Sequence, residues 1–114
     1  MTPNMMNTYV AEDTPEGLRD YAKETAEYQK PGGKMDVYMD AARALCREMD
    51  VTLCDCYAEW KKLAETTDTT LLLANRINHP TAEMHGLFAD MLFKTIFNDA
   101  PGITANAENG MYRR

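Results

Sequence analysis

The sequence contains no serine, which excludes catalysis by a serine nucleophile of this chain. Histidine is scarce as well, because only His79 and His85 are present. No third ligand stands at a spacing that would complete a metal site with this pair, so we expect no metal and no other cofactor. No run of about 18 apolar residues is present, so no transmembrane helix is predicted. Residues 1–10 lack the basic and apolar regions of a signal peptide.

Cysteine is limited to Cys46, Cys54 and Cys56. An odd number without the spacing of a disulfide framework favours reduced thiols, and with them a cytoplasmic location for the chain as given. Cys54 and Cys56 could bind a soft metal, but we favour a role as small apolar core residues. Positive charge is outnumbered, since the formal net charge is −6. An acidic chain repels phosphate groups, so we expect neither a nucleic-acid partner nor an anionic membrane partner.

Two segments are predicted to be helices, the first mainly from the residues at its start, since its apolar stripe is weak, and the second from its apolar spacing. The first is predicted over residues 15–29, with Thr14 as its N-cap and Pro15 at the first helical position. The second is predicted over residues 34–49, after the break at residues 31–33. Every step along its apolar stripe is three or four residues, so we expect these side chains to form one buried face: Met35, Tyr38, Met39, Ala42, Leu45, Cys46 and Met49.

Residues 51–57 are short, rich in β-forming residues and nearly continuous in apolar character, which predicts a strand covered on both faces. Residues 1–3 are similar to the last residues of another strand. A helix between two such strands would form a β-α-β unit. The expected fold class is therefore α/β, with a parallel sheet.

The remaining sequence predicts a short helix over residues 58–65 and one or two helical turns over residues 71–74. Residues 75–80 form a loop by their Asn and Pro content. Thr81 can cap a last helix with the apolar stripe Met84, Leu87, Phe88, Met91, Leu92, Thr95 and Ile96. Residues 99–114 are expected to be a flexible tail.

The loop and the helix after it carry the one motif that points to chemistry. His79-Pro80, with a second histidine six residues after the first and an apolar helix behind it, resembles the last conserved block of SGNH/GDSL hydrolases. The neighbouring sequence resembles one branch of that family, and the likeness covers residues 1–97. The segments that carry it are Met1-Thr2-Pro3-Asn4-Met5-Met6, Cys54-Asp55-Cys56-Tyr57, Trp60-Lys61-Lys62-Leu63, Asp68-Thr69-Thr70 and Leu73-Ala74-Asn75-Arg76-Ile77-Asn78-His79-Pro80.

The resemblance implies that residues 1–98 are the C-terminal part of a three-layer α/β/α, flavodoxin-like domain, rich in helix and holding one or two parallel strands. It implies an esterase acting on small carboxylic esters, such as acetyl esters of sugars, with His79 as the general base. The family's usual acid stands three residues before that histidine, where this chain has Arg76. Asn75 or Asn78 could orient the imidazole instead, and Asp68 is a further candidate. His85, Asp55 and Arg76 would lie beside the cleft.

Two further blocks of the family are absent, namely Gly-Asp-Ser and Gly-x-Asn-Asp, which supply the nucleophile and an oxyanion donor. We therefore expect this chain alone to be inactive, and Met1 to be an internal methionine of a longer parent whose N-terminal half is the missing partner. Two alternatives stay open. The chain could be a non-catalytic helical interaction module, or a half-domain complemented by a separate partner chain.

Overall fold

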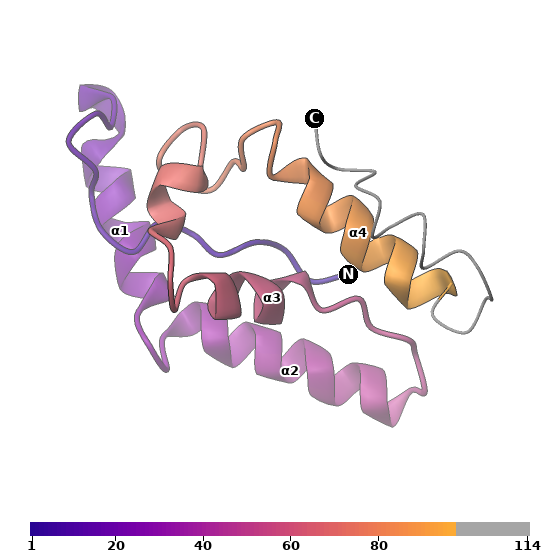
Figure 1. The fold of residues 1–114 in the computed structure, drawn as a ribbon. Helices are drawn as coiled ribbons and strands as arrows, with labels where there is room; N and C mark the ends of the chain where they lie inside the picture. Colours follow the sequence, from indigo (N-terminus) through magenta and orange to yellow (C-terminus); the bar gives the residue numbers. More distant parts are fainter. Residues whose placement is uncertain (98–114) are drawn as a thin grey trace.

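Helices carry the fold in the computed structural model, which describes residues 1–97 (Figure 1). The predicted helices at residues 15–29 and 34–49 are confirmed, although the first turn of the former is a 3-10 helix. The N-cap predicted at Thr14 is wrong, because Pro15 holds that position and no side chain caps the helix. The predicted tail, residues 99–114, lies outside the described part of the chain. The elements in chain order are η1 (Glu16–Leu18), α1 (Arg19–Gln29), α2 (Lys34–Glu48), α3 (Cys56–Leu63), η2 (Thr69–Leu72) and α4 (His85–Phe97).

The predicted α/β class, with one or two parallel strands of a flavodoxin-like domain, is wrong for this structure. Residues 1–97 contain no strand, and the β pairing described is a single antiparallel bridge between Leu73 and Pro80. The two segments predicted as strands do approach each other, because the Thr2 N–H donates to the Cys54 carbonyl at 2.9 Å. That contact alone makes no ladder, so the segments stay extended but irregular.

The last two residues of the predicted strand at residues 51–57, Cys56 and Tyr57, instead begin α3. Asp55 is the N-cap, and its Oδ1 accepts the Ala58 N–H at 3.1 Å. This bond satisfies one of the backbone donors that a helix leaves open at its start. The β-forming composition of the segment is therefore overridden at Asp55 by a local cap and by burial of the residues that follow it, Cys56, Tyr57 and Trp60.

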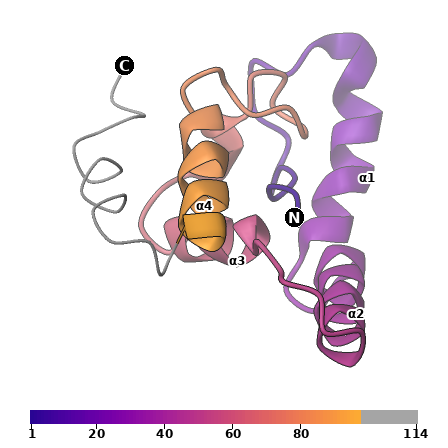
Figure 2. The same ribbon diagram turned by 90° about the vertical axis from the view of Figure 1, so that its right-hand side faces the viewer.

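The core lies where the N-terminal segment passes between α3 and the stretch of chain that runs from η2 to α4 (Figure 1). Met5, Met35, Tyr57, Trp60 and Leu73 form one buried cluster. Helices α3 and α4 pack together there, and the ring centroids of Trp60 and Phe88 are 6.4 Å apart. Viewed from the side, α4 lies against α3 while α2 lies beside α1 (Figure 2). The N-terminal residues, which include the strand end predicted at residues 1–3, are thus part of the core without forming a strand.

The prediction that the whole apolar stripe of α2 is buried is also wrong. Met35 is 8% exposed, whereas Tyr38 and Leu45 are 63% and 54% exposed. Neighbouring helices cover one side of α2, and within residues 1–97 no sheet covers the other. Apolar spacing indicates a face that can be buried, but the tertiary structure decides whether anything lies on it.

The last helix starts later than predicted. Residues 82–84 form a turn, and α4 begins at His85. Thr81 still acts locally, because its hydroxyl accepts the Met84 N–H at 3.4 Å. Within the described part of the chain, no helix has the length and apolar character needed to cross a membrane.

Candidate functional site

The His-Pro motif lies at the end of a closed loop. The Ala74 N–H donates to the His79 carbonyl at 2.6 Å, and the Thr81 N–H donates to the Leu72 carbonyl at 3.0 Å. These bonds flank the bridge between Leu73 and Pro80. The loop of residues 74–79 is therefore held at its neck, and its two ends cannot move independently.

Inside this loop, one side chain organises the backbone. The Asn75 Oδ1 accepts the N–H groups of Ile77, Asn78 and His79 at 3.1, 3.0 and 3.0 Å. Its amide nitrogen donates to the Asn78 Oδ1 at 2.9 Å. Asparagine commonly bonds the backbone a few residues ahead in this way, because its short side chain mimics a turn. The His79 backbone is thereby fixed from within the loop.

Arg76 adds an outer brace. Its φ angle is 60°, in the left-handed region that a non-glycine residue adopts only when its surroundings require it. The guanidinium Nη1 donates to the carbonyls of Leu71 and Leu73, and Nε donates to Asp13 at 3.0 Å. The hydrogen bond between the two side chains raises the pKa of Arg76 and lowers the pKa of Asp13. Arg76 is therefore committed to structure in this fold.

The N-terminal segment is hydrogen-bonded to two backbone carbonyls of the loop. The Asn4 amide donates to the Asn78 carbonyl at 3.0 Å, and the Asn7 N–H donates to the Ile77 carbonyl at 2.8 Å. Asn7 is completely buried and is itself held by Thr25 of α1, whose hydroxyl donates to its Oδ1 at 2.6 Å. The sequence predictions missed both Asn4 and Asn7, because they stand in a stretch without periodicity and contact partners more than 65 positions away.

His79 itself is exposed at the rim of this braced loop. Within residues 1–97 its imidazole has no hydrogen-bond partner, and the oxygens of Asn75 and Asn78 are occupied by the contacts described above. Neither amide touches the ring here, so the orienting role predicted for them stays a prediction. The arrangement combines a rigid backbone with a ring whose nitrogens remain open to a group from outside.

The other predicted site residues lie apart from His79. His85 is exposed at the start of α4, with its ring centroid 6.3 Å from that of Phe88. Asp68 caps η2 and accepts the Tyr9 hydroxyl at 2.6 Å. Asp55 caps α3. The structure therefore gathers Asn75, Arg76, Asn78 and His79 in one loop and leaves His85, Asp68 and Asp55 in other positions.

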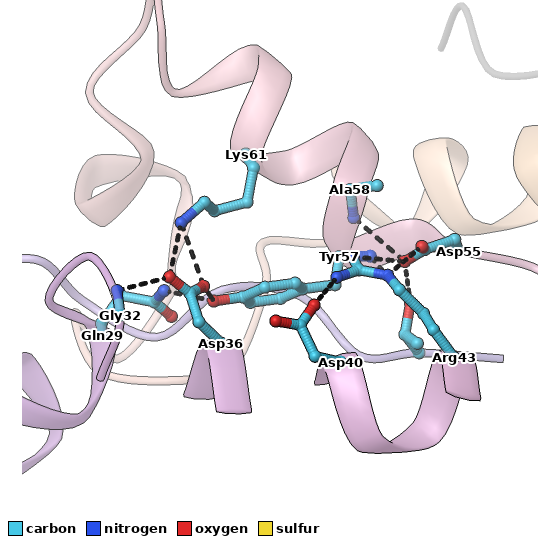
Figure 3. Close-up of polar contacts among 10 residues, drawn as sticks. Gln29, Gly32, Asp36, Asp40, Arg43, Asp55, Tyr57, Ala58 and Lys61 are labelled. Carbon is cyan, nitrogen blue, oxygen red and sulfur yellow. Dashed lines mark hydrogen bonds and ion pairs between the residues drawn. The ribbon is translucent and has the colours of Figure 1, made fainter. Parts of the chain in front are cut away.

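A second polar cluster, which the sequence did not predict, connects the N-terminal segment to three helices (Figure 3). The Met6 N–H donates to the Gln29 Oε1 at 2.7 Å, and the Gln29 amide donates to the Tyr57 hydroxyl at 2.7 Å. Tyr57 in turn donates to the Asp36 Oδ1 at 2.7 Å, which also lies 3.0 Å from the Lys61 Nζ. Each of these polar side chains is hydrogen-bonded or ion-paired to the next, which indicates a structural role for the cluster.

The same cluster continues at the start of α3. The Arg43 Nε lies 2.6 Å from the Asp55 Oδ2, and the Thr2 hydroxyl donates to the Asp55 Oδ1 at 2.9 Å. Partial burial alone would raise the pKa of Asp55, but the hydrogen bonds from Arg43, Thr2 and Ala58 outweigh it and lower that pKa. Asp55 is thus a charged structural anchor between α2, α3 and the N-terminal residues.

Burial also governs the tyrosine and the cysteine of α3. It raises the pKa of Tyr57, and the hydrogen bond to Asp36 raises it further. Burial raises the pKa of the Cys56 thiol to about 12. The Cys54 and Cys56 sulfurs lie 3.7 Å apart in the interior, and all three cysteines are free thiols. A thiol held in its protonated form is a poor nucleophile, so Cys56 is a poor candidate for catalysis.

Neither a metal site nor a deep pocket stands out in the described part of the chain. No group of three or more His, Cys, Asp or Glu residues within residues 1–97 could hold a metal ion. An open hollow of about 810 Å³ lies over the polar cluster. Its charged walls include the Asp36–Lys61 and Asp40–Arg43 ion pairs.

No protein-family model matches the chain, and neither a curated protein nor a solved structure is similar enough to it to count as a match. The functional interpretation therefore depends on the residues themselves and on the geometry of the loop that presents His79.

Proposed function

We propose that this chain supplies the general-base segment of a serine ester hydrolase of the SGNH/GDSL type and that it is inactive by itself. The nucleophilic serine and the oxyanion donors would come from a complementary N-terminal segment. The substrate would be a small carboxylic ester, such as an acetylated sugar. The observation that carries the proposal is the contrast at His79, whose backbone N–H and carbonyl are both hydrogen-bonded within the loop while its exposed imidazole has no hydrogen-bond partner within residues 1–97.

The chemistry assigned to His79 is proton transfer. The imidazole would accept the hydroxyl proton as the serine oxygen of the complementary segment attacks the ester carbonyl. It would return this proton to the departing alcohol when the tetrahedral intermediate collapses to an acyl-enzyme. A water molecule would then attack the acyl group and give its proton to His79, and the serine would regain a proton as the carboxylic acid leaves.

Rigid presentation of the base favours this chemistry because a general base must lie within hydrogen-bond reach of the proton that it accepts. The bonds of Asn75 and the neck of the loop fix the backbone at His79 without occupying the ring. No carboxylate contacts the imidazole within residues 1–97, and Asp68 is committed to Tyr9 and Thr70. The proposed centre is therefore a serine–histidine pair in which this chain contributes no acid.

The test begins with the DNA upstream of the Met1 codon. An open reading frame that encodes Gly-Asp-Ser would provide the complementary segment, which can be produced together with this chain. Hydrolysis of p-nitrophenyl acetate and of an acetylated monosaccharide is then measured. We expect turnover from the pair, and none above the rate of free imidazole from this chain alone.

His79→Ala should lower kcat on the order of 10³-fold in the complemented enzyme, because it removes the group that moves the proton. The matched control is His85→Ala, which removes the other, equally exposed histidine and should change kcat by less than about threefold. Equal and small effects of the two substitutions would refute the assignment. So would the absence of any Gly-Asp-Ser segment, upstream or on a second chain, that restores turnover.

A non-catalytic helical interaction module is the second candidate function. It is favoured by the apolar side chains exposed along α2, among them Val37, Tyr38 and Leu45, which are 58%, 63% and 54% exposed. Contiguous exposed apolar surface of this kind commonly marks a site of protein association. In this case the chain would act through a bound partner and would not require His79.

We place the chain in a reducing compartment such as the cytoplasm. The support is that all three cysteines are free thiols, with Cys54 and Cys56 buried. Protein purified from cytoplasm under alkylating conditions should carry three modified thiols after unfolding. Recovery of one or none would contradict this placement.

A further inference from the structure

The outward face of α2 has the residue spacing of a helix–helix interface. Positions 34, 37, 38, 41, 44, 45 and 48 follow the steps of three and four residues that bring side chains onto one side of a helix. All seven of these residues are exposed: Lys34, Val37, Tyr38, Ala41, Ala44, Leu45 and Glu48. We call this set the α2 seam. Its middle is apolar, and its two ends carry opposite charges.

Those two charges oppose the dipole of their own helix. Lys34 stands at the positive N-terminal end of α2 and Glu48 at the negative C-terminal end, where each charge has the less favourable sign. The Lys34 Nζ lies 4.5 Å from the centroid of the Tyr28 ring, a cation–π contact within the chain. Glu48 has no ion pair or side-chain hydrogen bond within residues 1–97. The helix dipole therefore explains neither charge, whereas an oppositely charged group of another chain could pair with each.

We infer that the α2 seam binds the α2 seam of a second copy of this chain, with the two helices antiparallel and crossing at Ala41. In that register Lys34 of one copy lies opposite Glu48 of the other, and the reverse pair forms at the far end. Val37 lies opposite Leu45, and the large Tyr38 lies opposite the small Ala44. Ala41 meets itself on the two-fold axis, where a small side chain lets the helices approach closely.

Charge complementarity favours a second copy as the occupant of the seam. The net charge of −6 on each chain disfavours self-association in general. An antiparallel pair nevertheless places opposite charges at both ends, whereas a parallel pair would place Lys34 against Lys34 and Glu48 against Glu48. Helix α2 itself lies at the opposite end of the molecule from the loop of residues 74–79 (Figures 1 and 2).

The expected interface is small. Four turns of paired helix, with Met49 and Val51 exposed just beyond the seam, correspond to about 1,000 Å² of buried surface, at the low end for specific contacts. We therefore expect a dissociation constant on the order of 10 μM at physiological ionic strength.

The experiment is sedimentation equilibrium of the full chain from about 5 to 500 μM under reducing conditions, a range that brackets the expected constant. Lys34→Glu and Glu48→Lys should each weaken dimerisation by about tenfold, because each places like charges opposite one another at both ends. The double variant Lys34→Glu/Glu48→Lys restores both pairs in reversed order and should return to within about threefold of the original constant. Both single changes improve the fit to the helix dipole, so the helix should still fold, which circular dichroism checks.

Leu92→Gln and Ile96→Gln are the matched controls, since both residues are exposed apolar positions on α4, at 42% and 62%. They should leave the dissociation constant unchanged, whereas Leu45→Gln on α2 should raise it. A monomer at 500 μM would overturn the inference. So would a dimer that the double charge swap fails to restore, or one that only the α4 variants disrupt.

This inference rests on the second candidate function, for which it names the partner, and is independent of the hydrolase. His79→Ala should dimerise like the original chain. A strictly monomeric chain that still hydrolyses esters when complemented would therefore refute dimerisation through the α2 seam and support the proposed hydrolase. A dimer that shows no ester hydrolysis with any complementary segment would support dimerisation and refute the proposed hydrolase.

Discussion

The side chain of Asn75 accepts three successive backbone N–H groups, which is the largest number of hydrogen bonds that one side chain makes to the backbone of residues 74–79. The motif that stood out in the sequence was His79-Pro80, yet the residue on which its geometry depends is four positions earlier. A buried or partly buried N–H group that loses its acceptor is costly, because water cannot fully replace the lost bond.

Asn75→Ala should therefore lower the free energy of unfolding by about 1–3 kcal/mol. Asn78→Ala is the control, because its side chain supplies only the acceptor for the Asn75 amide, and it should cost less than half as much. Chemical denaturation followed by the fluorescence of Trp60, the single tryptophan, measures both values. Equal losses for the two variants would show that the Asn75 carbonyl does not organise the loop.

Among the elements, α3 depends most on one polar residue. Asp55 caps the helix, pairs with Arg43 of α2 and accepts the Thr2 hydroxyl, so it joins three segments that are distant in sequence. For the same reason, the segment that was wrongly predicted as a strand over residues 51–57 changes from irregular backbone to helix at this residue. The Asp55 carboxylate accepts a backbone N–H at the start of the helix, whereas an extended segment without a neighbouring strand would leave its N–H groups without a protein acceptor.

Asp55→Ala should lower the free energy of unfolding by about 2 kcal/mol, since the cap and the ion pair disappear together. Asp55→Ser retains a capping oxygen but has no charge for Arg43, so we expect roughly half of that loss. Thermal and urea unfolding of the two variants separates the contributions. If serine were as damaging as alanine, the ion pair would dominate and the cap would be secondary.

At the scale of the whole molecule, charged side chains link the helices that apolar contacts leave loosely joined. Asp36 and Asp55 connect α2 to α3. Partial burial alone would raise the pKa of Asp36, but hydrogen bonds from Tyr57, Gly32 and Lys61 outweigh it and lower that pKa. Both carboxylates therefore stabilise the fold in their charged form.

Because both pKa values are lower in the folded chain than in the unfolded one, this stabilisation is complete above a pH of about 4 and is lost as the pH falls below it. The double variant Asp36→Asn/Asp55→Asn, which keeps an N-cap oxygen, should be less stable at neutral pH and less sensitive to acid. Urea unfolding at pH 6, 4 and 3 gives the comparison. Parallel losses of stability in both proteins would show that other groups control the acid response.

Much of the helical structure could be predicted from sequence because its signals are local. A proline near its start and the proline–glycine break after it located α1, apolar spacing located α2, and Asn and Pro content located the loop around His79. The bracing of that loop could not be predicted, since Asn4, Asn7 and Asp13 lie more than 60 positions from the residues that they contact. No spacing rule connects residues so far apart.

By itself, the sequence determined where helices can form, that His79 stands in a loop before a helix, and that the chain contains no serine nucleophile. These properties depend on residue identity and on neighbours within one or two helical turns. Packing of distant segments, in contrast, determines that α3 begins at Cys56 within the predicted strand, that Tyr38 and Leu45 remain exposed, and that Asp55 serves as an anchor. Each of these outcomes depends on which distant segment lies opposite, and that is set by packing of the whole chain.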